Sequence, residues 1–205
     1  MAFHQQIRGI VLNKVPTGEN HLRYTFLSST LGLQSALFRV RTKNGTPPAP
    51  DFFDLVELSI RHSTKGSILP FAKESECLVL SKRSELGTNH NRFVAASRIS
   101  RLFLDNGIHL FEPSSTFSLL ENSLDALIDG GDPTIIHLKT LFVFARGEGH
   151  PVKQAWFMRL DPYMREGARI ILENPVSKLG TGPVQSAGLL KSLTRWLNSE
   201  TEFIC

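Results

Sequence analysis

The sequence predicts an α+β protein, in which a small barrel of five β-strands is followed by a mainly α-helical domain. Up to about residue 80, short apolar runs alternate with polar residues and are separated by turns, as in small barrels. From about residue 85, apolar residues recur with the helical period. The pattern changes within residues 81–90, so we expect two domains, 1–82 and 83–205.

Five runs form the predicted barrel. The fourth alternates most clearly, with Val56, Leu58 and Ile60 inward, and Pro70 should place the fifth at an edge or a bulge. The segment Pro16-Thr17-Gly18 is expected to break the first strand. A loop follows the third run, because residues 42–50 contain three prolines and a glycine. The runs are 7–12, 22–28, 33–41, 54–62 and 68–80.

The second half of the chain predicts helices. Asp132 and Pro133 make a favourable helix start, with an acid at the N-cap and proline in the first turn. Ser114 or Ser115 is expected to cap the helix before it. The helix after Pro133 is apolar nearly all round, so it should lie centrally. The expected helices are 91–106, 114–128, 133–145, 163–173 and 186–198.

The excess positive charge lies in the first quarter of the chain. Residues 1–50 hold six basic side chains and one acid, whereas the remaining residues hold 17 basic and 18 acidic side chains. A basic module beside a neutral body is typical of proteins that bind polyanions, because phosphate neutralisation supplies most non-specific affinity for nucleic acids. Two alternatives remain, an acidic protein surface as the target and charges that merely solvate a small domain.

Catalytic signatures are missing from the sequence. It contains no Walker-type phosphate loop, and its seven histidines never pair at i, i+4. Cys77 and Cys205 cannot form a four-thiolate zinc site. The carboxylate pairs Asp51/Asp54 and Asp129/Asp132 are better explained by capping, and His137 by a hydrogen-bonded place in the core or an interface. We therefore expect no catalysis, no cofactor and no metal.

Membrane and secreted classes are also not expected. No apolar run approaches the 18 uncharged residues of a membrane span, and the first residues lack the pattern of a signal peptide. The sequence predicts a cytoplasmic protein.

The first 80 residues resemble the amino-terminal domain of the RecO family of bacterial recombination mediators. The resemblance lies in the order and spacing of short motifs, which are Arg8-Gly9-Ile10-Val11-Leu12, Gly18-Glu19-Asn20, residues 22–27, Gly32 with residues 33–41, residues 54–58, and Glu74-Ser75-Glu76. The helical remainder is compatible with the carboxy-terminal domain of that family. Two features differ from the family pattern: residues 147–180 have no cysteines where many members carry a four-cysteine zinc site, and Val40 stands where glycine is usual.

The resemblance implies an OB-fold barrel that binds single- and double-stranded DNA without sequence preference and promotes strand annealing in recombinational DNA repair. It implies RecR and the tail of single-stranded-DNA-binding protein as partners, a functional link to RecA, and a place in the bacterial cytoplasm at the nucleoid. The rival hypothesis is a protein–protein adaptor that has lost DNA contact, which Val40 and the sparse basic loop favour. A third possibility is an RNA-binding barrel.

OB-fold barrels bind nucleic acid through cations on phosphates and aromatic rings under bases. By strand parity Arg39 and Arg41 share a face, and Lys43 continues into the loop. Aromatic side chains could stack on bases or form the core, and these are Tyr24, Phe26, Phe38, Phe52 and Phe53. The predicted nucleic-acid-binding residues are Arg8, Lys14, Arg23, Arg39, Arg41 and Lys43.

Overall fold

A computed structural model describes residues 3–39, 49–62, 69–107, 112–179 and 185–205. The chain divides into two compact units, each described here by itself. The barrel unit comprises Met1–Ser84 together with Pro113–Phe117. The helical unit comprises Glu85–Glu112 and Ser118–Cys205.

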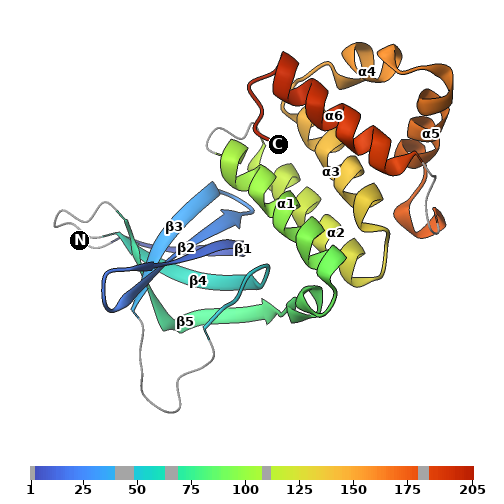
Figure 1. The fold of residues 1–205 in the computed structure, drawn as a ribbon. Helices are drawn as coiled ribbons and strands as arrows, with labels where there is room; N and C mark the ends of the chain where they lie inside the picture. The colour runs from blue at the N-terminus through green and yellow to red at the C-terminus, as the bar shows by residue number, and fades with distance from the viewer. Residues whose placement is uncertain (1–2, 40–48, 63–68, 108–111, 180–184) are drawn as a thin grey trace. The chain divides into compact units, whose positions relative to one another are not determined.

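The barrel unit is a closed barrel of five described strands in the order β1-β2-β3-β5-β4 (Figure 1). Neighbouring strands are antiparallel, except that β3 and β5 pair in parallel over a short stretch. With the helices that follow, this arrangement confirms the predicted α+β fold with an OB-like barrel. The strands are β1 (Phe3–Thr17), β2 (His21–Ser28), β3 (Gly32–Arg39), β4 (Leu55–His62) and β5 (Phe71–Ser81).

The long first strand closes the barrel because it pairs with two neighbours. Its first part pairs with β4 and its second part with β2, and the register shifts between Val11 and Asn13. Gly9 lies where β1 approaches β2 closely, since a Cβ there would lie 3.1 Å from the Cβ of Phe26. The strand ends at Thr17, within the Pro16-Thr17-Gly18 segment that was predicted to break it. Pro16 pairs with Leu22 next to the end of β1, where a missing N–H is tolerated.

The barrel core contains the inward residues of all five strands. The rings of Tyr24, Phe26 and Phe38 pack together at its centre, with 4.6 Å between the centroids of Tyr24 and Phe38. Complete burial of such side chains stabilises the fold by roughly 1.5–3 kcal/mol each. The other core residues are Ile7, Val11, Ala36, Val56, Leu58, Ile60 and Ala72.

The helical unit is built around α3, which carries the largest set of buried apolar residues among the described helices. Asp132 caps this helix as predicted, because its carboxylate accepts hydrogen bonds from the amides of Thr134 and Ile135. The six described α-helices are α1 (His90–Asn106), α2 (Pro113–Ile128), α3 (Pro133–Gly147), α4 (Val152–Ala155), α5 (Pro162–Glu173) and α6 (Ser186–Glu200).

The start of α2 differs from the expectation that Ser114 or Ser115 caps it. Glu112 is the N-cap and makes no side-chain capping bond, and Pro113 occupies the first turn. Proline removes one of the amides that a cap would satisfy and sets the helical φ, so the helix begins earlier than a serine cap predicts. Across the described ranges, none of the helices has both the length and the apolar character needed to cross a bilayer.

Candidate nucleic-acid interface

Two of the predicted arginines share an outward face of the barrel. Arg23 on β2 pairs with Leu37 on β3, and Arg39 pairs with His21. Both arginines are exposed, whereas the residues that alternate with them, Tyr24 and Phe38, are buried in the core. The register therefore places the two guanidinium groups as diagonal neighbours on one side of the β2–β3 pair.

An aromatic pair lies on the same face. The rings of His21 and Phe71 meet edge to face, with centroids 6.0 Å apart. Phe71 pairs with Leu37 across β3 and β5 and is 38% exposed, whereas the next residue, Ala72, is buried. Sequence reasoning missed both rings. Alternation of Phe71 with Ala72 could have indicated an outward ring, but the contact with His21 depends on the parallel β3–β5 pairing, which no local pattern reveals.

The barrel strands differ in charge. The sequences of β1, β2 and β3 contain no aspartate or glutamate, although they carry four of the predicted basic residues. Strands β4 and β5 contain acidic residues, of which Glu76 lies 2.9 Å from Arg61 and 3.0 Å from Lys73. The face formed by β2 and β3 is therefore the part of the described barrel best suited to a polyanion.

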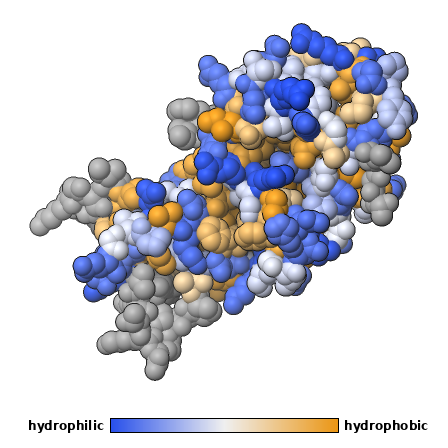
Figure 2. Space-filling model, viewed as in Figure 1, coloured by the Kyte–Doolittle hydropathy of each residue, from blue (hydrophilic) through white to orange (hydrophobic). Residues whose placement is uncertain are grey.

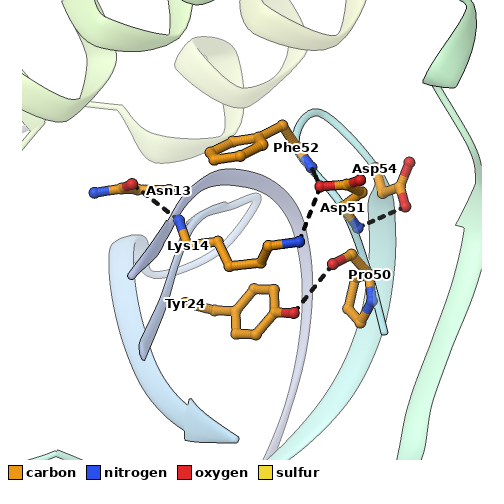
Figure 3. A network of polar contacts seen from close by, with 7 residues as sticks. All are labelled: Asn13, Lys14, Tyr24, Pro50, Asp51, Phe52 and Asp54. Carbon is orange, nitrogen blue, oxygen red and sulfur yellow. Dashed lines mark hydrogen bonds and ion pairs between the residues drawn. The ribbon is translucent and has the colours of Figure 1, made fainter. Parts of the chain in front are cut away.

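Lys14 lies apart from this face. It pairs with Tyr24, an inward residue of β2, and its ammonium group reaches the carboxylate of Asp51 at 3.1 Å (Figure 3). Burial raises the pKa of Asp51, but hydrogen bonds from the Phe52 amide and from Lys14 outweigh it, so the pKa falls below its ordinary value. The carboxylate is therefore ionised at neutral pH and neutralises Lys14.

Arg8 lies on β1 and so is also outside the face formed by β2 and β3. It lies opposite Glu57 in the β1–β4 pairing, and its guanidinium carbon is 5.6 Å from the ring centroid of Phe117. A cation–π contact of this kind contributes about 0.5–1 kcal/mol at an exposed site. Of the other predicted basic residues, Arg41 and Lys43 lie outside the described residues, as does Val40.

Of the two alternatives for Tyr24, Phe26 and Phe38, stacking on bases or a place in the core, the structure shows the core. Each is at most 1% exposed, because the barrel closes around these rings. The hydroxyl of Tyr24 donates a hydrogen bond to the carbonyl of Pro50 at 3.1 Å, which ties the segment before β4 to the core (Figure 3). Phe53 is also buried, whereas Phe52 is 38% exposed and remains a candidate for stacking.

The helical unit contains a groove of about 930 Å³ between α1, α3 and α6. Its apolar lining includes Leu102, Leu141 and Leu190, and no acidic residue lines it among the described residues. Hydrophobic and hydrophilic residues are interspersed on the face of the helical unit seen in Figure 2. The basic residues along the groove are Arg98, Arg101, Lys191 and Arg195.

His137 lines this groove as well. Burial and, to a smaller extent, the charge of Arg98 lower its pKa to about 4, so the imidazole is neutral at physiological pH. The imidazole is half-buried at the groove and does not lie fully in the core, and the hydrogen bond expected for it stays a prediction.

The carboxylates and cysteines that were considered as catalytic or metal-binding groups have other roles in the structure. The carboxylate of Asp54 accepts hydrogen bonds from the amides of Asp51 and Arg83, so it organises the start of β4. Cys77 and Cys205 are free thiols in different units. Within the described ranges, no three His, Cys, Asp or Glu side chains gather as metal ligands would.

No family model matches this chain, and no curated protein matches it significantly.

Proposed function

We propose that this protein binds single- and double-stranded DNA without sequence preference and anneals complementary strands, as a recombination mediator in DNA repair. The observation that carries the proposal is the face of β2 and β3, where Arg23 and Arg39 are diagonal neighbours beside the rings of His21 and Phe71. Cations for phosphates next to aromatic rings are what a barrel needs to bind a strand irrespective of its sequence.

Neutralisation of phosphate charge would provide the mechanism. Two complementary strands repel each other, and cations that neutralise both backbones reduce this repulsion. Pairing can then proceed on the protein surface without nucleotide hydrolysis. The resemblance to the RecO family supports this role, and with it RecR and RecA as functional partners in the bacterial cytoplasm, at the nucleoid.

A filter-binding titration tests the proposal. Single-stranded and duplex DNA of several sequences are titrated at two salt concentrations. We expect similar affinities for unrelated sequences and weaker binding at the higher salt, since each phosphate contact to a single strand adds about 0.7 to the slope of log affinity against log salt. Absence of binding even at low salt would contradict the proposal.

A protein–protein adaptor is the second candidate, and the groove of the helical unit favours it. An apolar lining bordered by Arg98, Lys191 and Arg195 fits a peptide that carries both apolar and acidic side chains. The tail of single-stranded-DNA-binding protein, which the resemblance implies as a partner, would be such a peptide. Binding of a labelled acidic, apolar peptide by a protein that does not bind DNA would favour the adaptor.

A further inference from the structure

One cation of the barrel is held by the protein's own carboxylate. The ammonium group of Lys14 lies 3.1 Å from Oδ1 of Asp51. The side chain of Asp51 is 70% exposed and that of Lys14 only 29%, so the ion pair can be reached from solvent on the carboxylate side. Ion pairs of this kind are weak, because water competes for both charges.

An exposed aromatic ring lies beside this ion pair. The Lys14 ammonium is 5.8 Å from the ring centroid of Phe52, and the amide of Phe52 donates a hydrogen bond to Oδ1 of Asp51 at 2.9 Å. Figure 3 shows the Phe52 ring above the Lys14 side chain, whose ammonium end points to the carboxylate of Asp51.

The backbone of this cluster is fixed to the barrel core. The buried hydroxyl of Tyr24 binds the carbonyl of Pro50, and the carboxylate of Asp54 accepts the amide of Asp51 at 2.9 Å. Next along the chain, Phe53 is buried and has a φ of 70°. The backbone that carries Phe52 is therefore held in place before any ligand binds, which lowers the entropic cost of binding.

We propose that Lys14 and Phe52 form a subsite for one nucleotide of a single strand, and that the carboxylate of Asp51 occupies on Lys14 the place of a backbone phosphate. Lys14 would bind the phosphate while the exposed ring of Phe52 stacks on the base. A strand that enters the subsite must first displace Asp51, so the protein carries an internal competitor for its own ligand. This inference rests on the proposed function.

Removal of the competing charge should strengthen binding. Asp51→Asn keeps an oxygen that accepts a hydrogen bond from the Phe52 amide but removes the negative charge that neutralises Lys14. An exposed ion pair is worth about 0.2–1 kcal/mol, so we expect single-stranded DNA to bind about 1.5- to 5-fold more tightly. The salt slope should steepen by up to about 0.7, because Lys14 then gains a phosphate without losing a carboxylate.

Two further variants identify the groups involved. The gain from Asp51→Asn should vanish when Lys14→Met is also present. Phe52→Leu should weaken single-stranded DNA about fivefold or more, since stacking of one base contributes at least about that factor, and should leave duplex affinity unchanged. Ultraviolet cross-linking of a thymidine oligomer, mapped by mass spectrometry, should mark Phe52.

The matched control is Glu173→Gln, which removes one negative charge from an exposed ion pair with Arg169 in the helical unit. The subsite is wrong if Asp51→Asn gains no more affinity than this control, if the gain survives Lys14→Met, or if the cross-link maps away from Phe52. DNA binding by the parent protein separates the subsite from the proposed function. If the parent binds DNA but the variants do not change its affinity as expected, only the subsite is refuted. If neither the parent nor Asp51→Asn binds, both are.

Discussion

Arg23 on β2 and Arg39 on β3 lie on the same face of the barrel as diagonal neighbours, because Arg23 pairs with Leu37, two residues before Arg39. Replacement of both arginines by alanine should therefore remove two phosphate contacts. We expect the slope of log affinity against log salt to flatten by about 1.4 for single-stranded DNA of any sequence.

The matched control for this double variant replaces two exposed basic residues of the helical unit, Lys153 and Arg159. Both variants should remain folded, since exposed charges usually change stability by less than about 0.5 kcal/mol. A parental slope in the barrel variant, together with a flattened slope in the control, would place the DNA site in the helical unit.

Tyr24→Phe separates a core role from a stacking role. The variant loses the buried hydrogen bond to the carbonyl of Pro50 and keeps the ring, so the free energy of unfolding should fall by about 1 kcal/mol. Affinity for single-stranded DNA should fall far less than the loss of a stacking ring would cause, because the ring is fully buried and only one of the two backbone anchors of the Phe52 subsite is removed. Urea unfolding and filter binding measure the two quantities, and a loss of affinity without a loss of stability would contradict the core assignment.

His137 should make stability depend on pH. Burial, with a smaller effect of Arg98, lowers its pKa from 6.5 to about 4 in the folded protein. Its contribution is therefore complete above pH 6.5 and is lost as the pH falls toward 4, because the unfolded chain binds the proton first. Between pH 7.5 and 5, the parent should lose about 2 kcal/mol more than His137→Gln in urea unfolding. Equal losses in the two proteins would contradict this assignment.

The protein is expected to contain no structural zinc. Its two cysteines lie in different units, and residues 147–180 contain none. Elemental analysis of protein purified without a histidine tag should show well under one zinc per chain, and treatment with a chelator should leave the unfolding midpoint unchanged. A stoichiometric ion would overturn this expectation.

Much of the fold could be predicted because local patterns report local structure. Alternation in residues 54–62 depends on one face being buried, and Val56, Leu58 and Ile60 are indeed in the core. Asp132 caps its helix because the capping bonds span only three residues. The full length of β1 could not be predicted in the same way, because its second part is held by pairing with β2 beyond a register shift.

The candidate site was less accessible to sequence reasoning. The outward position of Arg23 follows from parity, whereas the ion pair of Lys14 with Asp51 depends on the three-dimensional fold. These two residues are far apart in the sequence, and nothing near Lys14 indicates a carboxylate partner. The contact between His21 and Phe71 was unpredictable for the same reason.

The barrel unit is discontinuous in the chain, since Pro113–Phe117 belong to it and Glu85–Glu112 do not. During synthesis on the ribosome, the five strands therefore emerge before the last piece of their own unit. The cation–π contact between Arg8 and Phe117 can form only after residue 117 has been made, although Arg8 is among the first residues made. A nascent chain that pauses after the fifth strand would hold all five strands of the closed barrel but would still lack the contact between Arg8 and Phe117.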